Sequence, residues 1–154
     1  MEKVIVIGGT DSSGGAGLSR DIATLASLGV KAVPVVSAVT AQTNQRVEHI
    51  QHMSVDLIEA QLACAFKSDA IGAIKIGMLG TAQIVTLIAD MLSEFALVPI
   101  VLDPVLISSS GTRLLDVEAE DVLRHRLMPL CKVVTPTLLE AAMLTGVPVG
   151  DFAT

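Results

Sequence analysis

Short apolar runs rich in Val and Ile alternate along this chain with segments whose apolar residues recur at helical spacing. The first run, Lys3–Gly8, is short and continuous, as expected of a strand buried on both faces. Similar runs predict strands at Ala32–Val39, Ala70–Ile76, Pro99–Asp103 and Lys132–Thr135. Helical spacing predicts helices over Leu18–Leu28, from Ser54 to about Lys67, from Thr81 through Phe95, and over Glu118–Leu127 and Thr137–Thr145. Five strand–helix units in succession predict an α/β fold, with a mostly parallel central sheet in a three-layer α/β/α arrangement.

The 154 residues are expected to form one domain, because the sequence contains no repeat, no low-complexity tract and no linker. Glycine caps are expected to end two helices, at Gly29 and Gly146. The only long stretch predicted to be irregular is the polar segment Thr40–His52. A loop of this length inside a compact domain is usually functional.

Composition excludes several classes of protein. The net charge is −6, with no Trp, no Tyr and three Phe, so the basic stripes and stacking aromatics of a nucleic-acid surface are lacking. No charge-free stretch reaches the roughly 18–20 residues of a membrane span, and the N-terminal apolar run is too short for a signal peptide. Cys64 and Cys131 lie far apart in apolar surroundings, and we interpret them as reduced core residues of a cytoplasmic protein.

Five segments are expected to lie together at one edge of the sheet. Ligands of parallel sheets bind beyond the carboxyl ends of the strands. The segments expected there are Gly8–Gly17, Thr40–Gln42, Gly77–Gly80, Asp103–Gly111 and Thr135–Glu140. No combination of residues indicates a zinc site, a Ser/His/Asp triad or an activated cysteine.

The first of these segments is a glycine-rich loop, GGTDSSGGAG. It is not a phosphate-binding P-loop, because Gly15 stands where lysine is needed, and it lacks the third glycine of a dinucleotide fingerprint. Asp11 within the loop would repel a phosphate, so a neutral ligand offering hydroxyls or amines fits better. The alternative is a tight strand–helix turn in which glycine serves packing alone.

Asp103 ends an apolar strand and precedes Pro104, which keeps its predecessor extended and directs the carboxylate toward the edge of the sheet. This position suits a carboxylate that faces Mg²⁺ or a transferring phosphate, and the alternative is a capping or turn residue. Thr137 and Glu140 have the spacing of a helix capping box, with a carboxylate of a metal–phosphate site as the alternative. Met78 is interpreted as core, or else as a side chain over an apolar ring, and Lys75 as an exposed or paired strand residue.

Five motifs occur in order along nearly the whole chain, from Lys3 to about Gly146: GGTDSSGGAGLSRD, TAQT, KIGML, LDPVLISSSGTRLL and VVTPTLLEA. Together they resemble the hydroxymethylpyrimidine/phosphomethylpyrimidine kinases of thiamine biosynthesis, in the ribokinase-like superfamily. The resemblance implies ATP-dependent phosphorylation of 4-amino-5-hydroxymethyl-2-methylpyrimidine and then of its monophosphate, with Mg²⁺ as a further cofactor.

The resemblance also implies roles for particular residues. Gln42 would hydrogen-bond the aminopyrimidine, because an amide offers both a donor and an acceptor. The residues implied to line the ring are Gly9, Ala16, Met78 and Val105, with Asp21 nearby. Asp103 would hold the Mg²⁺–phosphate side by way of water, and Thr137–Glu140 would match the family's Asn-x-x-Glu stretch, with Thr in place of Asn and Glu140 retained.

The family continues beyond the last motif found here, into a Gly-Thr-Gly turn that forms the anion hole and carries the base. In this chain Gly111-Thr112 is followed by Arg113, so the resemblance implies the N-terminal, substrate-binding part, with its C-terminal part missing. Little kinase activity is therefore expected of these 154 residues alone, and an exposed sheet edge is expected to favour self-association or a homo-oligomer. Two other functions remain open: a pyridoxal kinase-type vitamin kinase, and a non-catalytic pyrimidine-binding or interaction module.

Overall fold

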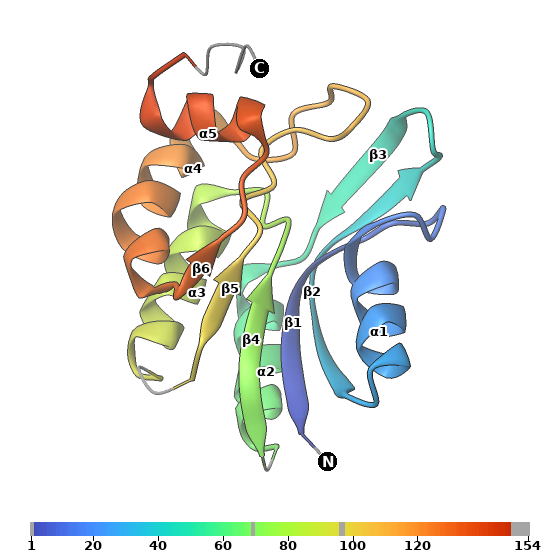
Figure 1. Ribbon diagram of the computed structural model, residues 1–154, viewed down its shortest axis with the longest axis vertical. Coiled ribbons are helices and arrows are strands. Elements are labelled where there is room, and N and C mark those ends of the chain that lie inside the picture. Colours follow the sequence, from blue (N-terminus) through green and yellow to red (C-terminus); the bar gives the residue numbers. More distant parts are fainter. Residues whose placement is uncertain (1, 69, 96–97, 149–154) are drawn as a thin grey trace, which may run out of the picture.

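The computed structural model describes residues 2–68, 70–95 and 98–148. They form six strands and five α-helices around one mixed sheet (Figure 1). The strands are β1 (Lys3–Thr10), β2 (Lys31–Gln42), β3 (Val47–His52), β4 (Ile71–Ile76), β5 (Ile100–Leu102) and β6 (Val133–Val134). The helices are α1 (Gly17–Ser27), α2 (Val55–Phe66), α3 (Ala82–Ser93), α4 (Val117–Val122) and α5 (Leu138–Thr145). After α4 the chain continues through a π-helical turn, Leu123–Leu127, and a 3-10 turn, Met128–Leu130.

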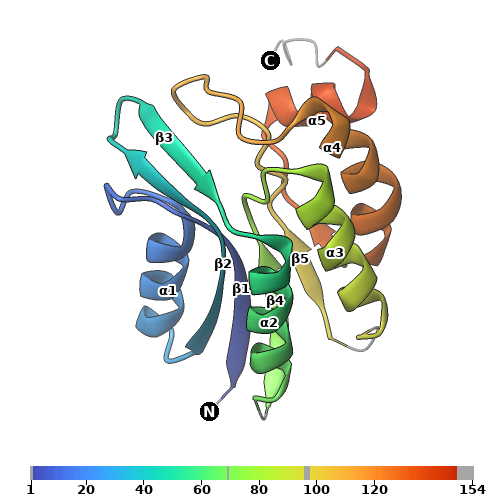
Figure 2. The same ribbon diagram turned by 180° about the vertical axis from the view of Figure 1, so that it is seen from behind.

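The strands lie in the order β3-β2-β1-β4-β5-β6. All neighbouring pairs are parallel except β2 and β3, which pair in antiparallel fashion. The connection from β1 to β2 runs toward the β3 edge of the sheet, and the connection from β4 to β5 runs toward the β6 edge. The two connections therefore run in opposite directions across the sheet. Right-handed crossovers therefore place α1 on one face and α3 on the other, with α2 beside α3 (Figures 1 and 2). The predicted α/β architecture with a mostly parallel sheet is confirmed.

The main core lies between the sheet and the face covered by α2, α3 and α4. Alternate residues of the central strands point into it, which explains why those strands are rich in Ile and Leu. Its fully buried strand residues are Ile5, Ile7, Ile74, Ile76 and Leu102, and the helices contribute Ile58, Leu62, Ile84, Ile88 and Leu92.

Short polar residues and glycines set the ends of the helices. Ser54 and Thr81 each accept a hydrogen bond from a backbone N–H of the first turn, at 3.3 Å in both cases. Gly29 and Gly146 adopt left-handed conformations, with φ of 72° and 70°, where residues with a side chain are disfavoured. Both predicted glycine caps are confirmed.

The segment Thr40–His52 is not the irregular loop that its composition predicts. Its first residues complete β2, and Val47–His52 forms β3 beside it. The turn is closed by a hydrogen bond from the Thr43 N–H to the Arg46 carbonyl, at 2.9 Å. Polar residues form a strand here because backbone pairing with β2 supplies the stabilisation, so no apolar alternation is needed. The hairpin extends beyond the body of the sheet (Figure 1).

Some positions predicted to be inside are exposed. Cys64 is exposed on α2, whereas Cys131 is partly buried, so the prediction of two core cysteines is wrong for Cys64. Ile22 shares the helical spacing of the apolar residues Leu18 and Leu25, which predicts a place on the buried face of α1, but it is 40% exposed, and Leu28 after that helix is 70% exposed. Helix α1 packs mainly against β1 and β2. Within the described ranges, no helix is long and apolar enough to cross a bilayer.

Candidate active site

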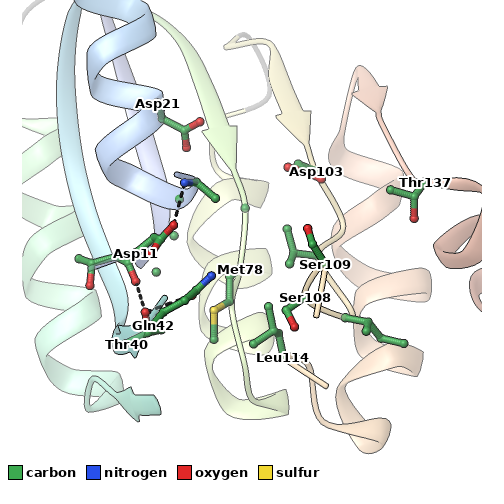
Figure 3. A pocket seen from close by; sticks show the side chains of 18 of the residues that line it. Asp11, Asp21, Thr40, Gln42, Met78, Asp103, Ser108, Ser109, Leu114 and Thr137 are labelled. Atoms are coloured by element: carbon green, nitrogen blue, oxygen red, sulfur yellow. Dashed lines mark hydrogen bonds between the residues drawn. The ribbon is translucent and has the colours of Figure 1, made fainter. Parts of the chain in front are cut away.

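A pocket of about 250 Å³ lies where the parallel strands end (Figure 3). The loops that follow β1, β4, β5 and β6 and the last residues of β2 itself contribute to its wall, as the rule for parallel sheets predicts. Every site residue predicted from the sequence lines it: Gly9, Ala16, Asp21, Gln42, Met78, Asp103, Val105, Thr137 and Glu140. The pocket is smaller than the roughly 300–1,000 Å³ typical of drug-sized ligands, so it suits a small ring.

The glycine-rich loop after β1 folds around the carboxylate of Asp11, which is 6% exposed. Asp11 accepts hydrogen bonds of 2.8 Å each from the N–H and hydroxyl of Ser13 and from the N–H of Ala16. Burial alone would raise the pKa of Asp11, but these hydrogen bonds outweigh it, so the pKa lies below its ordinary value. The N–H groups of Ser13 and Ala16 are thus directed at the chain's own carboxylate.

Gly17 allows this loop to close tightly onto the start of α1. Its φ is 58°, and a Cβ added there would lie 2.5 Å from the carbonyl oxygen of Gly9. A side chain at this position would therefore clash with backbone that cannot move aside. The contact fixes Gly9 at the pocket wall.

One end of the pocket is shaped for a flat, mostly apolar group. A Cβ at Gly9 would lie 3.0 Å from the sulfur of Met78, so the absence of a side chain leaves room beside the thioether. Met78 is 9% exposed and its backbone carbonyl accepts a 2.6 Å hydrogen bond from Ser37. Met78 is therefore buried, as its interpretation as a core residue predicts, and it also lines the pocket, where contact with a ring stays a prediction.

Gln42 reaches this end of the pocket from the end of β2 (Figure 3). Its backbone is tied to the glycine-rich loop: Ser12 donates to the Gln42 carbonyl at 2.9 Å and accepts from the Gln42 N–H at 2.8 Å. The neighbouring Thr40 lies 4% exposed beneath it, with its hydroxyl 2.7 Å from the Thr10 carbonyl. The hairpin and the loop therefore hold the Gln42 backbone in place, and the side chain extends from it along the wall.

The opposite end of the pocket carries charge. The ammonium of Lys75 on β4 lies 2.8 Å from Asp21 Oδ2 on α1 and 3.9 Å from Asp103 Oδ2 after β5. Burial raises the pKa of Asp103 above its ordinary value, Lys75 opposes the rise, and the carboxylates of Glu140 and Asp21 add to it. The Asp103 side chain nevertheless remains 42% exposed toward the pocket. Lys75 is paired, as predicted.

Thr137 and Glu140 form the predicted capping box at the start of α5. Glu140 Oε2 accepts from the N–H and hydroxyl of Thr137 at 2.9 and 2.8 Å, and Thr137 Oγ1 accepts from the Glu140 N–H at 3.3 Å. The other carboxylate oxygen, Oε1, accepts from the Leu106 N–H at 3.0 Å. Glu140 therefore ties α5 to the loop after β5.

The residues described contain no group of three or more His, Cys, Asp or Glu side chains able to hold a metal ion. Asp103 fits a magnesium ion that keeps most of its water, because Mg²⁺ commonly takes only one or two carboxylates together with substrate phosphates. Glu140 fits less well, because both of its oxygens already accept hydrogen bonds from the chain.

The segments Thr40–Gln42 and Asp103–Gly111 lie at this edge as predicted, but the sequence singles out only some of their residues. Thr40 belongs to the TAQT motif, and its burial beneath Gln42 gives it a role that the motif does not indicate. In the loop after β5, nothing in a run of serines indicates which side faces a pocket. The further lining residues of this loop are Ile107, Ser108, Ser109 and Leu114.

The family model and similar curated sequences agree on one family. The family model described as phosphomethylpyrimidine kinase matches residues 11–153. Hydroxymethylpyrimidine/phosphomethylpyrimidine kinase from Haemophilus influenzae is 39% identical over 151 residues, which cover 98% of this chain and 56% of that protein. The Escherichia coli protein of the same name is 38% identical over 94% of this chain and 54% of its own length. The chain thus spans about half the length of these curated relatives.

Solved structures agree with the sequence comparison. A crystal structure of phosphomethylpyrimidine kinase from Clostridium difficile 630 superposes with a TM-score of 0.90 at 34% identity, over 98% of this chain and 65% of that one. Pyridoxal kinase from Bacillus subtilis, solved as an ADP complex, gives 0.82 at 34% identity, over 95% and 54%. The fold is therefore shared with both kinds of vitamin kinase.

Proposed function

This chain belongs to the phosphomethylpyrimidine kinase family, and we propose that it supplies the substrate-binding half of an enzyme that phosphorylates 4-amino-5-hydroxymethyl-2-methylpyrimidine and its monophosphate with ATP. The observation that carries the proposal is the pocket itself, which joins a ring-sized apolar end to a charged end within one small volume. The hydroxymethyl arm of such a ring would extend from the first end toward the second.

At the ring end, Gln42 hydrogen-bonds the aminopyrimidine, and Met78 and Val105 contact the faces of the ring. Gly9 and Ala16 leave space for its edge because they have little or no side chain. An amide covered by a bound ring is a strong selector, since a ring that fails to pair with it leaves a buried polar group unsatisfied. The pocket thus favours a ring with polar atoms on one edge.

At the charged end, Asp103 is the residue that would hold Mg²⁺ by way of water, with Glu140 and Thr137 on the nucleotide side. When bound, the ion would neutralise charge on the transferring phosphate. Lys75 and Asp21 neutralise one another, so they hold this wall without adding net charge to it.

Pyridoxal is the second candidate substrate, because solved pyridoxal kinases share this fold at TM-scores of 0.81 to 0.84. A third possibility is that the chain binds a pyrimidine without transferring phosphate. Binding of the two rings, measured side by side, separates the first two candidates, and ADP release in the presence of the bound pyrimidine separates the third.

The test is calorimetric titration of the pyrimidine alcohol into the wild type and Gln42→Ala, in a full-length homologous context. Loss of a buried hydrogen-bond partner costs about 1–3 kcal/mol, so we expect affinity to fall about five- to 150-fold. Gln51→Ala is the matched control, because Gln51 is exposed on β3 away from the pocket. Equal affinity in the wild type and Gln42→Ala would remove Gln42 from the site, and tighter binding of pyridoxal would favour the second candidate.

We also propose that the 154 residues alone bind the ring but release ADP slowly, and that they self-associate through the edge at β6. Val133 on that short strand is 47% exposed, and unpaired strand edges favour association. Size-exclusion chromatography with an ADP-release assay tests both points. A monodisperse monomer with turnover within about tenfold of a full-length homologue would contradict them.

A further inference from the structure

Thr40 and Gln42 are two residues apart at the end of β2, where the pairing with β3 shifts register after Ala41. The Thr40 hydroxyl oxygen lies 2.7 Å from the Thr10 carbonyl oxygen and 3.3 Å from the side-chain amide of Gln42, with Oε1 the nearer amide atom. Figure 3 shows the Gln42 side chain extending from beside Thr40 toward Met78. The amide therefore has one end against Thr40 and the other toward the pocket.

The number of protons decides which end faces Thr40. A threonine hydroxyl has one proton, and the Thr10 carbonyl can only accept, so their 2.7 Å contact uses it. Toward Gln42, Thr40 Oγ1 then offers lone pairs alone. Two oxygens facing each other would share no proton, and 3.3 Å lies outside the roughly 2.5–3.0 Å range of an O–H···O hydrogen bond. An amide N–H in the same place would donate a hydrogen bond to a lone pair of Thr40 Oγ1.

We propose that Thr40 is a positioning residue that selects the orientation of the Gln42 amide, so that Nε2 donates to Thr40 Oγ1 and Oε1 faces the pocket. The two ends of an amide have nearly the same shape, so the half-turn that exchanges them costs little packing. Thr40 is suited to this task because it is buried and its β-branched side chain is stiff.

The orientation of the Gln42 amide determines which ligand groups can hydrogen-bond to it. A fixed carbonyl oxygen requires a donor on the ligand, which an exocyclic amine supplies. An oxo group at the same ring position would place two acceptors together, with no proton between them. This step rests on the proposed function, because it concerns an aminopyrimidine, whereas the amide orientation itself is a property of the chain without ligand.

The orientation is tested first, by nuclear Overhauser effects in the unliganded 154-residue chain. We expect the Gln42 Hε2 protons to show their stronger effects to the Thr40 side chain. Thr40→Val, which has nearly the same shape, should shift both amide proton signals, whereas Thr40→Ser should retain them. Stronger effects to the Met78 methyl group, together with signals unchanged in Thr40→Val, would overturn the proposal.

Selectivity is tested second, by titrating the 4-amino and 4-oxo forms of 5-hydroxymethyl-2-methylpyrimidine into the same three proteins. The wild type and Thr40→Ser should prefer the amine by about ten- to 150-fold, and Thr40→Val by no more than about threefold. An undiminished preference in Thr40→Val would overturn the role of Thr40. If the wild type binds neither ring, the proposed function fails, and the Overhauser pattern alone decides the orientation. Thr40→Ala removes the same hydroxyl and replaces Thr40→Val if that variant does not fold.

Discussion

Two aspartates, Asp11 and Asp103, each directly follow a strand of the same sheet, and both line the same pocket. Asp11 is 6% exposed, accepts three hydrogen bonds of 2.8 Å and has a lowered pKa. The Asp103 side chain is 42% exposed, its nearest cation is 3.9 Å away and its pKa is raised. One carboxylate is held by the fold, and the other is left free to meet a ligand.

The difference comes from the residues that succeed each aspartate in the chain. After Asp11 the glycine-rich loop turns back, so the N–H groups of Ser13 and Ala16 point at the carboxylate. After Asp103 comes Pro104, which has no N–H to donate and keeps the chain extended. A partly buried carboxylate that accepts no hydrogen bond from the fold lowers stability. Such a cost is expected where function requires the carboxylate.

The largest expected effect concerns Asp103. In a full-length homologous context, Asp103→Asn should lower turnover about 10²–10³-fold, because it weakens the hold on the Mg²⁺ that would neutralise the transferring phosphate. Its melting temperature should equal or slightly exceed that of the wild type, because the raised pKa indicates that the ionised group is not stabilised by the fold. Asp121→Asn, at a carboxylate 78% exposed on α4, is the control. Normal turnover of a destabilised Asp103→Asn would show that Asp103 serves the fold, and would contradict its contrast with Asp11.

Asp11→Asn should show the opposite pattern, a loss of stability. An amide can accept at only one oxygen, so its nitrogen would face either the two donors of Ser13 at Oδ1 or the Ala16 N–H at Oδ2. Leaving such buried groups unsatisfied costs about 2–3 kcal/mol of unfolding free energy. Urea unfolding of the 154-residue chain measures it. Unchanged stability would show that the loop holds its shape without this carboxylate.

The smallest effect is the dependence of stability on pH. The pKa of Asp11 is lower in the folded than in the unfolded chain, so its contribution is present above about pH 4 and is lost as pH falls through the folded value. The pKa of Asp103 is higher in the folded chain, so its ionisation lowers stability near neutral pH, and the cost disappears as pH falls through the folded value. In urea unfolding from about pH 3 to pH 7, the free energy of unfolding of Asp11→Asn should therefore fall less toward acid pH than that of the wild type. Identical pH profiles for Asp11→Asn and the wild type would contradict this.

Much of the fold could be predicted from the sequence, because strand and helix periods and glycine caps are local signals. The site could be placed because the carboxyl ends of parallel strands meet at one edge, which brings Gly9, Met78 and Asp103 together. The hairpin strand β3 could not be predicted, because its polar residues are held by backbone pairing with β2. Exposure of Cys64 and Ile22 depends on which faces of the helices are covered, and a single sequence does not show it.

The role of Asp11 marks the same limit within the site. Its charge alone predicts repulsion of a phosphate, but its carboxylate is occupied by the loop that carries it. Only the folded path of Ser13–Ala16 shows this, since a charge in a glycine-rich loop can face inward or outward. Asp103 was predicted correctly as a pocket residue because Pro104 restricts the local backbone.

The most direct measurement is a pH titration of the carboxyl carbons of Asp11 and Asp103 by ¹³C NMR in the unliganded 154-residue chain. The contrast between them predicts that Asp11 titrates below the ordinary aspartate value of about 3.9 and Asp103 above it. The Asp103 signal should also move when MgATP is added in a full-length homologous context, while that of Asp11 should stay in place. An Asp103 that titrates at or below Asp11, or an Asp11 signal that alone responds to MgATP, would contradict the assignment of one carboxylate to the fold and the other to the ligand.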